Sequence, residues 1–296
     1  MTIEHALEWG KEELYKSGVP ESELSAWYLL QSCFRRAGGT GQTFSRSDYF
    51  LKKKEEILPD QKKRYELLVE KRKQRMPLEY IIGYTEFMGL TFSVDENVLI
   101  PRQDTETLVE AVYPLCKGKR VLDLCTGSGC IGLSIGVLGA PASLVLSDIS
   151  AAALRVAEQN GRQLAAEESG LRSVQMEFVC GDLFENIKGV FDIIVSNPPY
   201  IESGGISGLM PEVGMYEPIT ALDGGGDGLD FYRRIIGSSP SYLCGGGMLY
   251  VETGYNQGES VAALMREHGF EQTKIRKDLA GNDRVVSGRT VAERKD

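Results

Sequence analysis

The feature that most constrains the fold is an alternation of short apolar runs and helical stretches from residue 120 onward. Helical stretches such as Ile131–Leu138 and Ala151–Leu164 separate runs that have the length and composition of buried strands. This alternation predicts an α/β fold with a mainly parallel, Rossmann-like sheet and helices on both faces, in which ligands bind beyond the carboxyl ends of the strands. The expected strands are Arg120–Leu124, Ser143–Ser147, Val174–Val179, Phe191–Ser196 and Met248–Glu252.

The first part of the chain has the periodicity of helices instead. Trp27 and its apolar neighbours are expected in a core and not around a ligand. These features predict a small all-helical domain over residues 1–83. Its helices are expected at Ile3–Ser17, Glu21–Arg36, Ser47–Ile57 and Gln61–Arg75.

The pattern changes after residue 83. Residues 84–98 alternate between polar and apolar types around Gly89, which predicts a hairpin-like linker. Residues 99–296 are expected to form the larger α/β domain. Its first helix is expected to begin near Asp104 or Thr105, because either side chain can cap free backbone N–H groups.

Composition excludes several classes of protein. No apolar stretch is long enough to span a membrane, and the amino terminus lacks the pattern of a secretory signal. We therefore expect a cytoplasmic protein without a membrane partner. The six cysteines show no C-x-x-C spacing and only two histidines are present, so we expect reduced thiols and no metal site.

The net charge of −9 is unevenly distributed. Residues 1–85 hold 15 Lys or Arg and 13 Asp or Glu, whereas the rest of the chain holds 18 and 29. An acidic α/β domain is a poor electrostatic match for DNA, and no direct DNA contact is expected. The basic run from Lys52 to Arg75 fits either a solvated helix face or a docking surface for an acidic or RNA-rich partner.

A glycine-rich turn follows the first predicted strand. Gly127, Gly129 and Gly132 match the spacing G-x-G-x-x-G. Glycines let the backbone approach a ligand closely, and the following helix offers its N-terminal N–H groups. The turn predicts a nucleotide-type ligand. Because nicotinamide-binding enzymes share this motif, it does not identify which nucleotide-type ligand binds.

Two acidic residues follow other predicted strands. Asp148 can accept hydrogen bonds from both hydroxyls of an adenosine ribose, or it can cap the helix that begins at Ala151. Asp182 can accept a hydrogen bond from an adenine amino group while Leu183 packs against the ring, although an ordinary turn explains this pair equally well.

The most specific signal is Asn-Pro-Pro-Tyr at residues 197–200, directly after an apolar strand. Prolines fix φ and lack an N–H donor, so the carbonyl groups here can face a ligand. We expect an –NH2 group on a planar substrate to donate to the Asn197 side chain and to the Pro198 carbonyl, with Tyr200 as a stacking face. Both acceptors gain strength if that nitrogen becomes positive during reaction. A rigid turn without a chemical role is the alternative.

Together these motifs resemble class I methyltransferases that act on amide or exocyclic nitrogens, and more closely the HemK/PrmC family of protein-(glutamine-N5) methyltransferases. That family modifies the glutamine of the Gly-Gly-Gln motif in class 1 peptide-chain release factors, and its helical N-terminal domain helps to hold the release factor. The resemblance extends over nearly the whole chain. It rests on Pro77–Gly83, Leu99–Glu106, Asp123–Gly129, Asn197–Ile201, Glu217-Pro218 with Ala221-Leu222, and Asp278–Val286.

The resemblance implies S-adenosylmethionine as the cofactor and release factors as the protein substrate. The chain departs from the family pattern at Cys125, where many methyltransferases have glycine, and at Leu183, where some relatives have an aromatic residue. The predicted catalytic residues are Asn197, Pro198 and Tyr200. The predicted cofactor-binding residues are Cys125, Thr126, Gly127, Ser128, Gly129, Asp148, Asp182, Leu183 and Asn197. The predicted substrate-binding residues are Asn197, Pro198, Pro199, Tyr200 and Arg102.

Four alternatives stay open at this point. The same amide chemistry serves a methyltransferase for a ribosomal-protein glutamine, and a flipped adenine offers a similar planar –NH2 group to a nucleic-acid methyltransferase. A nicotinamide oxidoreductase shares the glycine turn but gives Asn197–Tyr200 no task. A binding module for release factors or ribosomes with a vestigial pocket is the non-catalytic alternative.

Overall fold

The computed structural model describes residues 1–34 and 44–291. They form two compact units, one from Met1–Gly83 with Met210–Tyr216 and the other from Tyr84–Leu209 with Glu217–Asp296. No helix in the described ranges is long and apolar enough to cross a membrane. All six cysteines carry free thiols.

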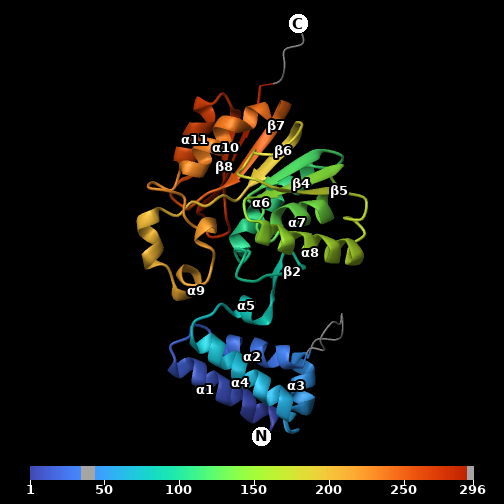
Figure 1. Cartoon of the computed structure of the whole chain (residues 1–296), viewed down its shortest axis with the longest axis vertical. Coiled ribbons are helices and arrows are strands. Elements are labelled where there is room, and N and C mark those ends of the chain that lie inside the picture. The colour runs from blue at the N-terminus through green and yellow to red at the C-terminus, as the bar shows by residue number, and fades with distance from the viewer. Residues whose placement is uncertain (35–43, 292–296) are drawn as a thin grey trace. The chain divides into compact units, whose positions relative to one another are not determined.

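The first unit is helical (Figure 1). Its core contains Tyr65 and Trp27. Gly10 lets its helix lie against Tyr65, since an added Cβ would be only 2.0 Å from the Tyr65 hydroxyl. That hydroxyl donates to the Ala26 carbonyl at 3.2 Å. The helices are α1 (Ile3–Lys16), α2 (Ser22–Cys33), α3 (Arg46–Lys52), α4 (Pro59–Lys73), α5 (Leu78–Ile82) and α9 (Pro211–Gly214).

Two of the helix predictions need comment. The end expected for the second helix, at residues 35 and 36, lies outside the described residues. The helix expected over Ser47–Ile57 was too long, because α3 ends at Lys52. The Lys53 and Glu55 carbonyls instead accept hydrogen bonds from the N–H groups of Glu4 and Ile3, at the start of α1.

A partly buried ion-pair cluster fixes the segment Met210–Tyr216 within this unit. The Glu212 carboxylate accepts hydrogen bonds from Arg72 at 2.9 Å and from Arg75 at 2.6 Å. Burial would raise the pKa of Glu212, but hydrogen bonds from these two arginines lower it to about 2. Two members of the predicted basic run are thus occupied by a carboxylate of the same chain.

Residues 84–93 form a hairpin, as the sequence predicts. Strands β1 (Tyr84–Phe87) and β2 (Leu90–Ser93) pair antiparallel around Met88-Gly89, where both residues have positive φ angles. Asn160 anchors the hairpin: its side chain accepts from the Ser93 N–H at 2.8 Å and donates to the Ser93 carbonyl at 3.1 Å.

The second unit contains a seven-stranded sheet in the order β5-β4-β3-β6-β7-β9-β8 (Figure 1). Neighbours from β5 to β7 are parallel, whereas β9 runs antiparallel to both β7 and β8. This confirms the predicted mainly parallel sheet. The strands are β3 (Arg120–Leu124), β4 (Ser143–Asp148), β5 (Gln175–Cys180), β6 (Phe191–Ser196), β7 (Leu243–Glu252), β8 (Glu271–Lys277) and β9 (Asp283–Arg289).

Both faces of the sheet are buried, because successive side chains of a strand point to opposite faces. Val121 and Leu122 of β3 illustrate this, since Val121 lies in one core with Leu133 and Leu122 lies in the other with Ile235. The first core includes residues of α6 (Glu106–Val112), α7 (Cys130–Gly139) and α8 (Ala151–Glu167). The second includes residues of α10 (Asp230–Ser238) and α11 (Gly258–Glu267).

The cap predicted at Asp104 or Thr105 was wrong. A short 3-10 turn over Gln103–Thr105 precedes α6, and neither residue caps the helix with its side chain. Asp104 pairs with Arg284 at 3.2 Å, and the Thr105 hydroxyl accepts a hydrogen bond from Asn197. Both side chains are therefore directed to other partners.

Candidate functional site

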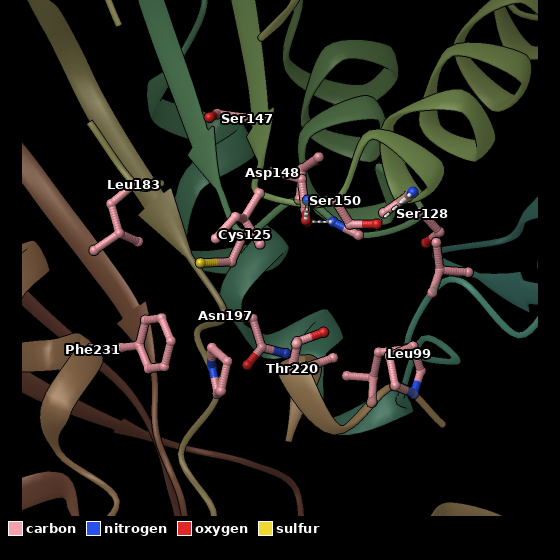
Figure 2. A pocket seen from close by; sticks show the side chains of 18 of the residues that line it. Leu99, Cys125, Ser128, Ser147, Asp148, Ser150, Leu183, Asn197, Thr220 and Phe231 are labelled. Carbon is pink, nitrogen blue, oxygen red and sulfur yellow. Dashed lines mark hydrogen bonds between the residues drawn. The ribbon is translucent and has the colours of Figure 1, made fainter. Parts of the chain in front are cut away.

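A cavity of about 460 Å³ opens where β3, β4 and β6 end (Figure 2). This is the edge of a parallel sheet at which ligands are expected. Of the predicted site residues, Gly129, Pro198 and Tyr200 do not line the cavity. The predicted residues that do line it are Arg102, Cys125, Thr126, Gly127, Ser128, Asp148, Asp182, Leu183, Asn197 and Pro199.

The glycine turn is held from beneath by a buried carboxyl group. Asp123 Oδ2 accepts hydrogen bonds from the Thr126 hydroxyl at 2.6 Å and from the Gly132 N–H at 2.9 Å. Burial raises the pKa of Asp123 to about 7. Gly132 is required for this contact, because a Cβ there would lie 2.8 Å from Asp123 Oδ2.

The turn needs residues in the left-handed backbone region. Cys125, Gly127 and Gly129 have φ angles of 58°, 55° and 81°. Glycine adopts this conformation freely, whereas cysteine is strained in it. Glycine would therefore adopt the backbone conformation of position 125 with less strain than cysteine does. Burial raises the pKa of the Cys125 thiol, so the side chain is a neutral part of the cavity wall.

Asp148 lies at the end of β4, and both carboxylate oxygens accept from the backbone. Oδ2 accepts from the Gly127 N–H at 2.8 Å, and Oδ1 accepts from the Ser150 N–H at 2.9 Å (Figure 2). Burial raises the pKa of this carboxyl group. Ser150, and not Asp148, caps α8 by accepting from the Ala153 N–H. Each oxygen of Asp148 keeps a lone pair for a ligand hydroxyl.

Two hydroxyl groups of the cavity wall are unsatisfied within the described chain. Ser128 Oγ and Ser147 Oγ are buried and have no hydrogen-bond partner. Most buried polar atoms have a partner, so these two indicate a polar ligand beside a mostly apolar wall. A nucleoside has this combination of a flat apolar base and a hydroxylated sugar.

Two residues of α10, Phe231 and Arg234, line the cavity although they were not predicted from the sequence. Leu183 lies on the same side as Phe231 of α10, and Leu99 lies across from them with Ser128 (Figure 2). Arg234, also on α10, donates to Asp182 Oδ2 at 2.7 Å. This bond leaves Asp182 less available to an adenine amino group than the sequence alone indicates.

The Asn-Pro-Pro-Tyr segment begins where β6 ends. The Ser196 hydroxyl donates to the Leu124 carbonyl at 2.8 Å, so it ties this segment to the start of the glycine turn. Asn197 lines the cavity, and its Nδ2 lies 3.5 Å from Thr105 Oγ1. Tyr200 packs instead against the core of the second face, and burial raises its pKa to about 12.

Arg102 enters the cavity from the segment before α6. Its Nη2 donates to both oxygens of Glu217, at 2.6 and 2.7 Å. Glu217 is buried, and Thr220 shortly after it also lines the cavity. Arg102 thus holds the segment that contains Glu217 and Thr220 at the wall of the cavity.

Comparison with known proteins agrees with this site. Residues 5–83 match the family model "PrmC N-terminal domain", and residues 102–212 match "Methyltransferase small domain". A protein of Geobacter sulfurreducens named release factor glutamine methyltransferase is 39% identical over 97% of this chain and 96% of its own length. A protein of the same name from Clostridium acetobutylicum is 45% identical over 78% of this chain and 81% of its own length.

The fold is also found in a solved structure, a methyltransferase from Pyrococcus furiosus. Its TM-score is 0.52 at 16% sequence identity, and the match covers 69% of this chain and 91% of that one. This likeness concerns the fold alone. The near full-length relatives confirm the resemblance predicted from the sequence, and the chain belongs to the family of release factor glutamine methyltransferases.

Proposed function

We propose that this protein transfers the methyl group of S-adenosylmethionine to the side-chain nitrogen, N5, of the glutamine in the Gly-Gly-Gln motif of class 1 release factors. The observation that carries the proposal is that Asn197 lines the same cavity as Asp148. A nucleoside-type ligand held at Asp148 and a planar amide held at Asn197 would therefore meet inside one cavity. Transfer in the cytoplasm fits, since translation termination takes place there.

The cavity residues fit S-adenosylmethionine. Asp148 offers carboxylate lone pairs to the ribose hydroxyls, and the unsatisfied hydroxyls of Ser128 and Ser147 offer further hydrogen bonds. Leu183 and Phe231 offer apolar surface to the adenine. When bound, the cofactor supplies an electrophilic methyl group on a positively charged sulfur.

The chain's own task is to position a weak nucleophile. The lone pair of an amide nitrogen is delocalised, so orientation matters more than a strong base. Because Asn197 Nδ2 faces Thr105, its Oδ1 is left to accept a hydrogen bond from the substrate –NH2 group. The second N–H is proposed to be accepted by the carbonyl of Pro198, which does not itself line the cavity but stands between two residues that do, Asn197 and Pro199. Both acceptors stabilise the positive charge that grows on this nitrogen during transfer.

Tyr200 has a different role in this proposal from the stacking face expected at first. Its carbonyl accepts from Gln257 at 3.0 Å, and its ring packs against the core of the second face. This arrangement fixes the far end of the segment, so that Asn197 and Pro198 are held at both sides. Pro199 lines the cavity and gives the target side chain an apolar wall.

We further propose that the helical unit helps to hold the release factor. The support is the match of residues 5–83 to the N-terminal domain model of this family. The helical unit also presents large apolar side chains to solvent, among them Phe50 and Leu51, which are 68% and 82% exposed. Contiguous exposed apolar side chains are typical of protein-binding surfaces, and these two residues are neighbours in α3.

An acceptor comparison tests the function. The protein is incubated with methyl-labelled S-adenosylmethionine and, in parallel, with a class 1 release factor, total ribosomal protein, ribosomal RNA or duplex DNA. We expect label on the release factor, and none on a release factor whose Gly-Gly-Gln glutamine is replaced by alanine. Label on ribosomal protein or nucleic acid alone would refute the proposed substrate.

A further inference from the structure

We propose that Glu252 is a positioning residue, which holds the Asn197 side-chain amide so that Oδ1 faces the substrate nitrogen. The inference deepens the proposed function and rests on the role given there to Asn197. Glu252 does not line the cavity, so it acts through Asn197 and Thr105 and not by touching the substrate.

The strand register brings the two residues together. Val251 of β7 pairs with Ser196 of β6 in the parallel sheet, so Glu252 and Asn197 follow at adjacent strand ends. Glu252 is only 2% exposed. Its backbone carbonyl accepts from the buried Tyr232 hydroxyl at 2.8 Å, which fixes this strand end against α10.

The Thr105 hydroxyl and the Asn197 amide are the polar side-chain neighbours of the Glu252 carboxyl at this strand end. Asn197 Nδ2 lies 3.5 Å from Thr105 Oγ1. Burial raises the pKa of the Glu252 carboxyl, whereas the polar side chains of Thr105 and Asn197 beside it lower it. The other carboxyl oxygen, Oε2, is buried and has no hydrogen-bond partner among the described residues. The buried carboxyl group of Glu252 therefore keeps one oxygen, Oε2, that can still accept a hydrogen bond.

Burying a carboxylate costs free energy unless it is paired and hydrogen-bonded. Arg284 offers partial charge compensation, but it is already bound to Asp278 at 2.9 Å and to Asp104 at 3.2 Å. A neutral side chain at this position would have a lower free-energy cost of burial. What a carboxylate adds is that it only accepts hydrogen bonds, so it specifies which end of the Asn197 amide faces it.

The orientation of the amide decides whether the site can bind its substrate. With Nδ2 toward Glu252 and Thr105, Oδ1 is presented to the substrate –NH2 group. If the amide turned by half a rotation, two N–H donors would face each other and the substrate nitrogen would lose an acceptor. Glu252 removes this second state when it is ionised.

The local charges favour a carboxyl group that can change state near neutrality. Burial raises the pKa of Glu252 to about 7, while hydrogen bonding to Thr105 and the nearby Arg284 act in the opposite direction. Asp104 raises this pKa as well. Tyr200 and Tyr232 face the same group, and burial raises the pKa of each, so they stay neutral across this range.

A charge swap tests the inference with the full-length protein. Asn197→Asp places a second carboxyl group beside Glu252, and we expect kcat on the release factor to fall at least a hundredfold. Adding Glu252→Gln supplies a donor for one oxygen of that new carboxylate and leaves the other oxygen to accept from the substrate. We expect the double variant to recover at least tenfold over Asn197→Asp alone, although Glu252→Gln by itself lowers kcat about tenfold.

Two controls separate positioning from folding. Glu110→Gln removes an exposed carboxylate on α6 and should leave kcat unchanged. The dissociation constant for S-adenosylmethionine should stay within twofold for Glu252→Gln, because Glu252 does not line the cavity. Losses that simply add in the double variant would overturn the inference, because two independent structural defects behave in that way.

A readout without turnover keeps the inference distinct from the proposed function. In ¹⁵N NMR spectra, the side-chain amide of Asn197 should shift with pH around neutrality in the wild type and should not shift in Glu252→Gln. If this titration is seen but no release factor is methylated, the substrate is wrong and the positioning role stands. If methylation occurs but the amide does not titrate and no rescue is found, the positioning role fails.

Discussion

Asp148 Oδ2 accepts a hydrogen bond of 2.8 Å from the backbone N–H of Gly127. One carboxylate therefore holds the glycine turn after β3 and also offers its remaining lone pairs to the cavity. The proposed cofactor site is preformed by this bond, since the turn and the carboxylate fix each other. Preorganisation of this kind lowers the cost of binding.

Replacement of Asp148 by alanine should weaken binding of S-adenosylmethionine by about 10- to 100-fold, the range expected for hydrogen bonds to a charged group. Isothermal titration with the cofactor measures this. Glu110→Ala, which removes an exposed carboxylate, should bind as the wild type does. Unchanged affinity in Asp148→Ala would remove this residue from the cofactor site.

Gly132→Ala should destabilise the protein by about 1–3 kcal/mol, because the added methyl group would lie 2.8 Å from Asp123 Oδ2. A decrease in the free energy of unfolding would point to the packing at Gly132, because replacing glycine by alanine normally stabilises a helix. Urea unfolding gives the free energy. Gly204→Ala is the matched control, because a Cβ there meets nothing within 4 Å. Equal stability of both variants would contradict the packing account.

Asn160→Ala should loosen the linker hairpin and the glycine turn together. The buried amide donates to the Ser128 carbonyl at 2.9 Å and also holds Ser93. Loss of buried hydrogen bonds predicts about 1–3 kcal/mol of destabilisation and faster amide exchange in β2. The neighbouring Gln159→Ala removes only a 3.4 Å contact and should have little effect. Slow exchange in β2 of Asn160→Ala would argue against the anchor.

The contribution of Asp123 to the free energy of unfolding of the ligand-free protein should fall as pH rises from about 4 to about 7. Burial raises the pKa of Asp123 from 3.8 to about 7. In that window the folded protein keeps the proton that the unfolded chain has lost, so rising pH favours unfolding. The Asn side chain of Asp123→Asn does not titrate. Between about pH 4 and about pH 7, the free energy of unfolding of this variant should therefore fall less than that of the wild type, by on the order of 1 kcal/mol. Parallel slopes in urea titrations would contradict the shift.

The sequence predicted those parts of the fold in which local pattern and tertiary environment agree. The observed β3 and β6 have the predicted ends, because each is a buried apolar run closed by a motif. Strand β8 was missed, since its residues are mostly charged and exposed at the edge of the sheet. An edge strand needs apolar residues on one face at most, so its periodicity is weak.

Some residues of the candidate site could likewise be predicted from local sequence, whereas others depend on the tertiary fold. Asp148 and Asn197 stand directly after apolar runs, so sequence reasoning found them. Phe231 and Arg234 lie on a helix that was not predicted, and only the tertiary fold brings them to the cavity. Glu252 was recognised as a strand end, but its relation to Asn197 depends on the register between two strands that are distant in sequence.

The central claim is that Asn197 presents a glutamine amide of a release factor to the methyl group. The most direct measurement combines the protein, methyl-labelled S-adenosylmethionine and a class 1 release factor, and locates the label by peptide mass spectrometry. We predict label on the glutamine of Gly-Gly-Gln with the wild type, and none with Asn197→Ala, which should still bind the cofactor. Label on another residue, or full labelling by Asn197→Ala, would contradict the account.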